Sequence, residues 1–117
     1  PLKVLRGRGS LSIMNLLTLL PSSKYCGEAP TGWDALHNLG IDKVLADLYF
    51  TLPFDLGIIE AEQKFIGRDD PTQGWTEECG KVFVAEPYEV DSEASELVGL
   101  KADYLDLIKE AKVNFGF

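Results

Sequence analysis

The pattern of apolar and polar positions predicts three clear helices. Apolar residues recur at helical spacing in residues 41–49, 90–98 and 103–112. Pro53 follows the first of these segments, and Gly99 closes the second, as expected for residues that end helices. A shorter helix is predicted to begin near Trp33 and to stop at Gly40.

Two further segments have the pattern of buried strands. Residues 55–60 and 81–85 are continuous apolar runs rather than alternating ones. Such runs are typical of strands that are buried on both faces, as in a parallel sheet covered by helices. Residues 67–75 between them are rich in Gly, Pro and Asp, which predicts a loop. We therefore predict an α/β fold with a small, mostly parallel sheet covered by helices.

Residues 11–20 are so densely apolar that a helix here would be buried nearly all round. Pro21 would stop this helix. It is either a core helix or a docking surface for a missing partner. The candidate partners are the remaining part of a parent chain and a second copy of this chain.

The ends and charges of the chain limit its class and its partners. The chain begins with Pro1 rather than Met, so residues 1–117 are expected to be a single α/β domain or a fragment of a larger parent domain. Residues 1–9 contain Lys and Arg but no acidic residue, and we predict a basic, flexible start. From residue 25 onwards there are 7 basic and 19 acidic side chains, which argues against nucleic acid as a partner.

Cysteine content and hydropathy predict a cytoplasmic protein without a membrane partner. Cys26 and Cys79 are the only cysteines, and they cannot hold an iron–sulfur cluster or a structural zinc unaided. No secretory signal pattern marks the chain, which favours reduced thiols. The longest apolar run, residues 16–20, is too short to span a bilayer.

Short motifs in a consistent order carry a family resemblance. They are Leu-Ser-Ile-Met-Asn-Leu-Leu at 11–17, the helix and strand at 41–60, the loop at 67–74, and Val-Ala-Glu-Pro-Tyr-Glu-Val-Asp at 84–91. Together they resemble the C-terminal portion of the family called domain of unknown function 362. Members of that family are often joined to a ferredoxin-like iron–sulfur module. The resemblance therefore implies a redox setting, with any iron–sulfur cluster elsewhere in the parent protein and no cofactor within this chain.

The resemblance also marks individual residues. Asn15 fits a Lys-Asn pair of the family, although Met14 stands where a lysine is usual, and His37 resembles a histidine that follows this helix. The sequence departs from the family pattern again where Glu60, Asp70 and Glu86 replace aspartate or glycine. No reaction follows from the resemblance, and none of the common hydrolase, phosphate-loop or zinc-protease motifs is present in the sequence.

Polar residues near the predicted strand ends are the candidates for a site, because ligands of open parallel sheets bind beyond the carboxyl ends of the strands. The metal candidates are Glu60, Asp70, Glu86 and Asp91, and the ligand-binding candidates are Asn15, His37, Thr72 and Gly74. Several carboxylates with one imidazole would suit a divalent cation such as magnesium or manganese.

Each candidate also has a purely structural interpretation. Asp91 lies in the first turn of a predicted helix, where a carboxylate stabilises the helix dipole. Glu60 can emerge into solvent, His37 can be a packing residue, and Asp70 has the composition of an ordinary turn. Two functions therefore remain open. The chain is a ligand- or metal-binding domain of a redox-associated protein, or a non-catalytic interaction domain that docks through residues 11–20.

Overall fold

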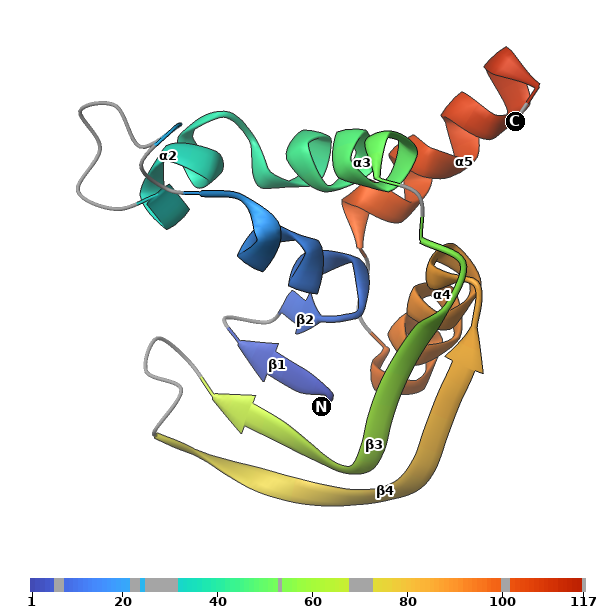
Figure 1. Ribbon diagram of the computed structural model, residues 1–117. Helices are drawn as coiled ribbons and strands as arrows, with labels where there is room; N and C mark the ends of the chain where they lie inside the picture. Colours follow the sequence, from blue (N-terminus) through green and yellow to red (C-terminus); the bar gives the residue numbers. More distant parts are fainter. Residues whose placement is uncertain are drawn as a thin grey trace.

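The computed structural model describes residues 1–5, 8–21, 24, 32–52, 54–67, 73–99 and 102–116. Its strands are β1 (Lys3–Leu5), β2 (Arg8–Ser10), β3 (Gly57–Gly67) and β4 (Gly74–Ala85). Its helices are the 3-10 helix η1 (Ile13–Leu19) and the α-helices α2 (Gly32–Asn38), α3 (Ile41–Thr51), α4 (Pro87–Val98) and α5 (Asp103–Phe115). These elements form the small α/β fold that the sequence predicts (Figure 1).

The sheet is mixed, with strand order β2-β1-β3-β4. β1 pairs with β3 in parallel, whereas β1–β2 and β3–β4 are antiparallel pairs. The prediction of a mostly parallel sheet is therefore wrong. β3 and β4 extend towards each other to Gly67 and Gly74, which leaves a connection too short for the crossover that parallel strands need.

The β3–β4 hairpin is long and bends through its middle (Figure 1). The pairing register shifts between Ala61 and Gln63, opposite Cys79 and Gly80, which is the signature of a β-bulge. Gly80 has a φ of +63°, a conformation that residues with a side chain rarely adopt. The bulge therefore explains how one hairpin follows a curved path around the helices.

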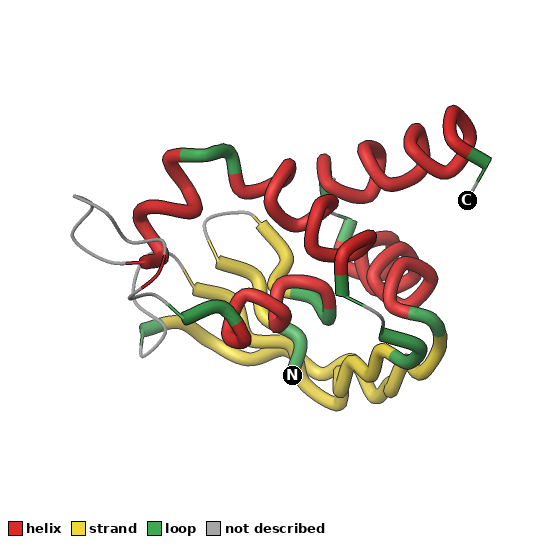
Figure 2. Tube along the Cα trace, turned by 45° about the horizontal axis from the view of Figure 1, so that its top comes forward, coloured by secondary structure: helices red, strands yellow, loops and turns green. Residues whose placement is uncertain are grey.

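Helices gather on one side of this hairpin (Figure 2). The residues of β3 that face α4, Gly57, Ile59 and Ala61, are buried, and Ile59 is only 3% exposed. α5 packs against both α3 and α4, and its Tyr104 and Ile108 enter the same core. The core therefore lies between one sheet face and the helices.

Several local predictions are confirmed. α3 begins at Ile41 and ends before Pro53, α4 ends at Gly99 with a φ of +68°, and α5 begins at Asp103. α2 ends two residues before Gly40, which has a φ of +92°. These boundaries follow local signals, namely apolar periodicity, proline and glycine.

Two other local predictions are wrong. Residues 1–9 were predicted to be a flexible start, but residues 3–5 and 8–10 are strands that pair with each other in the sheet. The apolar runs at 55–60 and 81–85 were predicted to be buried on both faces. Ile58, Val82 and Val84 are instead 58%, 54% and 56% exposed, because helices cover only one face of the hairpin.

The apolar segment at 11–20 forms a 3-10 helix, and this helix is not buried all round as predicted. Ile13, Leu16 and Leu17 are buried, whereas Leu19 is 60% exposed. η1 packs against α3 and α4, so its apolar side belongs to the core of this chain.

Candidate functional site

Asp91 is a buried carboxylate at the junction of η1, α4 and α5. Its side chain is 0% exposed. Oδ1 accepts hydrogen bonds from the Ser12 amide at 2.8 Å and the Ser12 hydroxyl at 2.5 Å. Oδ2 accepts from the Ile13 amide at 3.0 Å and from the Tyr104 hydroxyl at 2.9 Å. Asp91 therefore caps the start of η1 from a distant helix and ties three elements together.

The electrostatics of Asp91 fit this structural role. Burial raises its pKa above the ordinary value, although the hydrogen bonds from Ser12, Ile13 and Tyr104 act in the opposite direction. Its oxygens already accept four hydrogen bonds, which uses the capacity of a carboxylate. The sequence prediction that it lies in the first turn of its helix is wrong, because α4 begins at Pro87 and the acidic residue of its first turn is Glu89. Asp91 instead accepts hydrogen bonds from amides at the start of η1.

Glu86 occupies the position immediately before α4 and caps that helix. Its Oε2 accepts from the amides of Tyr88 at 3.0 Å and Glu89 at 3.3 Å. Its Oε1 accepts a 2.6 Å hydrogen bond from the Tyr49 hydroxyl of α3. Burial, followed by the hydrogen bond to Glu86, raises the pKa of Tyr49 above its ordinary value. Glu86 therefore joins α3 to the start of α4.

Lys112 of α5 completes this half-buried cluster. Its Nζ lies 4.5 Å from the ring centroid of Tyr88 and 5.1 Å from that of Tyr49. Both distances are within the range of cation–π attraction. The cluster brings α3, α4 and α5 together, and its polar groups contact each other rather than an open cavity.

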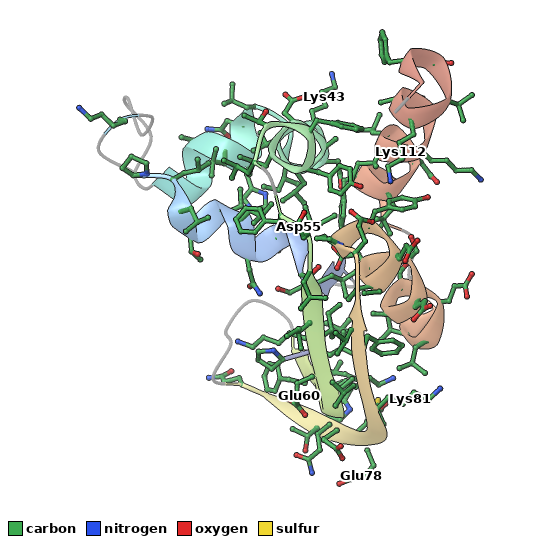
Figure 3. All side chains as sticks on the ribbon, turned by 45° about the vertical axis from the view of Figure 1, so that its right-hand side comes forward. Lys43, Asp55, Glu60, Glu78, Lys81 and Lys112 are labelled. Carbon is green, nitrogen blue, oxygen red and sulfur yellow. The ribbon has the colours of Figure 1, made fainter. Side chains whose placement is uncertain are left out.

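Glu60 is exposed and lies in the middle of β3, not at a strand end as predicted, because β3 continues to Gly67. Its Oε1 accepts a 2.8 Å hydrogen bond from the Glu62 amide. Figure 3 places Glu60 and Glu78 near the bend of the hairpin. There a cleft of about 370 Å³ is lined by Pro1, Leu2, Lys3, Glu60, Glu62, Gln63, Phe65, Thr76 and Glu78.

Of the other predicted site residues, Asn15, His37 and Gly74 lie in the described part of the chain. Asn15 is exposed on η1, and His37 is exposed in the last turn of α2. Gly74 has a structural explanation, because a Cβ there would collide with the carbonyl oxygen of Ile66 and lie 2.7 Å from Phe65 Cζ. Asp70 and Thr72 lie outside the described residues.

A metal site finds no support in the described part of the chain. Among those residues, no group of three or more His, Cys, Asp or Glu side chains is arranged to hold a metal ion. Glu86 lies immediately before α4 and Asp91 lies within it, but Glu86 bonds to Tyr49 and Asp91 bonds to Ser12. The two carboxylates are thus committed to different neighbours, and the predicted divalent cation stays a prediction.

The uncovered face of the β3–β4 hairpin carries a group of apolar side chains. Ile58 lies directly opposite Val84, and Glu60 lies opposite Val82, so these four residues share one face. Leu56, two residues before Ile58, is also 58% exposed. We call Leu56, Ile58, Val82 and Val84 the outer apolar patch. A cluster of large exposed aliphatic side chains is unusual for a solvated surface and is typical of an interaction site.

Charged side chains surround the outer apolar patch. Glu60 and Glu62 lie on the same face of β3 as Ile58, because alternate residues of a strand point to the same side. Further along this face, Lys64 forms a 3.1 Å salt bridge with Glu77. Asp55 is exposed just before β3 begins (Figure 3). Three carboxylates, those of Asp55, Glu60 and Glu62, thus lie beside the patch, and Lys3 lines the same cleft as Glu60 and Glu62.

Sequence reasoning missed the outer apolar patch and the partners of the two capping carboxylates. The available signal for the patch was weak, because an apolar run does not say how many faces of a strand are covered. The Glu-Pro pair at 86–87 did signal a helix start, since an acidic N-cap before proline is common. Nothing in the local sequence of Tyr49 or Ser12 pointed to a carboxylate far along the chain.

Comparison with known proteins adds no relative. No protein-family model, curated protein or solved structure matches the chain. The resemblance to domain of unknown function 362 therefore stays a prediction. Among the described residues, no helix has both the length and the apolar character needed to cross a membrane.

Proposed function

We propose that this chain is a non-catalytic interaction domain that docks another protein surface on its outer apolar patch. One observation carries the proposal. Large aliphatic side chains that are 54–58% exposed share one face of the hairpin, while Ile59 and Ala61 on the opposite face are 3% and 0% exposed. Burial of such a patch in a complex is favourable, at about 25 cal/mol for each Å² of apolar surface removed from water.

The proposal moves the docking surface from residues 11–20 to the sheet. Leu11, Ile13, Leu16 and Leu17 are buried in the core of this chain, which leaves little of that segment for a partner. A metal- or ligand-binding role is less well supported, because the two buried or half-buried carboxylates already have structural partners.

The proposal retains the setting predicted from the sequence. The docked partner is the remaining part of the parent chain or a second copy of this chain, and the family resemblance implies an iron–sulfur module nearby. A cytoplasmic location is part of the proposal, and the free thiol of Cys79 is consistent with it. Reduced thiols and an acidic surface suit the cytoplasm whether the partner is the remaining part of the parent chain or a second copy.

Site-specific photo-crosslinking in the source cells tests the docking surface. A photoreactive phenylalanine analogue at Val82 is expected to give a discrete crosslinked product, because this side chain is exposed inside the patch. The same analogue at Val113, which is 75% exposed on α5, is the matched control. The product at position 82 should disappear when Ile58→Asp is added. Equal products at both positions, or none at position 82, would exclude the patch as a docking surface.

A further inference from the structure

We infer that the occupant of the outer apolar patch is an amphipathic helix with lysine or arginine beside its apolar stripe. This inference rests on the proposed function and names the chemistry of the partner.

Charge complementarity favours a basic partner. Glu60 and Glu62 share the face of the patch, Asp55 lies beside Leu56, and the only lysine of β3, Lys64, is already paired with Glu77. The whole chain carries a formal net charge of −8. Opposite charges at the rim of an interface steer association and exclude wrong partners. A partner with acidic flanks would place like charges next to Glu60 and Glu62.

The width of the patch suits a single helix. Ile58, Val82 and Val84 come from the two neighbouring strands β3 and β4, whose spacing is about 4.8 Å, and Leu56 comes just before β3, so the apolar strip is narrow. An α-helix with its side chains is about 10 Å wide. Leu56, just before β3, and Ile58 would be about 7 Å apart in an extended chain. This spacing is close to the ~6 Å rise between residues i and i+4 of a helix.

The free edge of the sheet is less suited to a partner strand. β4 is the terminal strand, and its register is interrupted opposite Ala61 and Gln63. Gly80 at this bulge has a φ of +63°, and the exposed Lys81 follows it. Bulges and edge lysines disrupt the regular ladder that an added strand requires. The face of the hairpin is therefore a better docking surface than its edge.

A second copy of the chain is a poorer occupant than a basic helix. Two copies joined face to face would bring Glu60 and Glu62 of each towards those of the other. Like charges placed opposite each other across an interface are destabilising. Each copy would also carry the same formal net charge of −8.

Designed peptides test the inference directly. The probe is a Leu/Lys peptide of about 18 residues, long enough to form a helix on binding, with leucines at i, i+3, i+4 and i+7. One control replaces every lysine by glutamate, and another scrambles the order of leucine and lysine. Isothermal titration calorimetry should detect binding of the ordered Leu/Lys peptide only.

Matched variants separate the apolar and the charged contributions. Ile58→Asp should weaken binding at least tenfold although it adds a negative charge, because it disrupts the apolar contact. Val113→Asp adds the same charge on the exposed surface of α5 and should leave binding unchanged. The pair Glu60→Gln and Glu62→Gln should weaken binding about threefold at low salt and less at high salt, because salt screens exposed charges. Glu93→Gln with Glu110→Gln, both on exposed helix positions, is the control.

The outcomes distinguish this inference from the proposed function. Equal binding of the lysine and glutamate peptides, or equal loss in the Ile58 and Val113 variants, overturns the basic-helix partner. If crosslinking at position 82 succeeds while the ordered peptide does not bind, the docking surface stands and this partner class is wrong. A crosslinked product with twice the mass of the chain, together with a dimer in sedimentation, would assign the patch to a second copy instead.

Discussion

The junction around Asp91 and the outer apolar patch invert the usual distribution of residue types. Asp91 is 0% exposed although it is an acidic residue, and Ile58 is 58% exposed although it is among the most apolar. The difference lies in their neighbours. Asp91 finds four hydrogen-bond donors within the chain, whereas Ile58 lies on the sheet face without a covering helix.

This contrast teaches which of the two regions is complete within the chain. A buried carboxylate is tolerated when its hydrogen bonds are satisfied, and the Asp91 junction meets that condition. In the part of the chain that the structure describes, no buried side-chain nitrogen or oxygen lacks a hydrogen-bond partner. The outer apolar patch has the opposite character, because its side chains remain in water unless a partner covers them. The first region therefore serves the fold and the second is available for function.

Asp91→Ala should have the largest effect on the junction. The substitution leaves the amides of Ser12 and Ile13 and the Tyr104 hydroxyl without their acceptor. We expect the free energy of unfolding to fall by about 3–4 kcal/mol, since each buried unsatisfied donor costs ~1–3 kcal/mol. Urea denaturation measures this loss. Asp91→Asn keeps one acceptor oxygen and should lose less. If Asp91→Ala lowers the free energy of unfolding by less than about 0.5 kcal/mol, the hydrogen bonds of Asp91 do not stabilise the fold.

Neighbouring isoleucines on the two faces of β3 should differ strongly. Ile59→Ala removes a side chain that is 3% exposed, and we expect a loss of about 3 kcal/mol from transfer and cavity terms. Ile58→Ala, on the exposed face, should cost about 0.5 kcal/mol or less. Thermal and urea unfolding of both variants gives the comparison. Similar losses at 58 and 59 would mean that the chain itself covers the outer face.

The smallest expected effect is a change of stability with pH, and it tests the Asp91 carboxylate specifically. Because burial raises the pKa of Asp91 above the ordinary 3.8, the folded state binds its proton more tightly than the unfolded state. The associated stability is complete below pH 3.8 and is lost as pH rises through the folded-state pKa. The free energy of unfolding of the wild type relative to Asp91→Asn should therefore fall as the pH rises above 3.8, and level off once the pH has passed the folded-state pKa. Urea titrations across this range measure it. A rise of this difference with pH would mean that the pKa of Asp91 is lowered instead.

The fold was predictable where it depends on local signals and not where it depends on pairing. The periodicity of residues 41–49 and of residues 90–98 identified α3 and α4, because helix hydrogen bonds are local. Strand pairing is not local. β3 and β4 contain polar residues such as Glu62, Gln63, Glu77 and Glu78 beyond their apolar runs, so both strands were predicted too short. Because both strands were predicted too short, the sequence did not reveal that β3 and β4 form a hairpin.

The candidate site was predicted even less completely. Asp91 and Glu86 were predicted as metal candidates, whereas in the structure each accepts hydrogen bonds from a different element. Glu60 was expected at a strand end and lies in mid-strand. The metal assignment required these carboxylates to converge, and only the positions of η1, α3 and the hairpin decide where each one points.

The sequence by itself determined the α/β class, the positions of α3, α4 and α5, and the glycine and proline residues that bound them. These features depend on residues within a few positions of each other. Only the tertiary structure decided that β3 pairs with β4 in an antiparallel hairpin and that helices cover one of its faces. It also brought Ser12 to Asp91 across 79 positions and left Ile58 in water. Burial depends on which elements meet in space, and that depends on contacts between residues far apart in the chain.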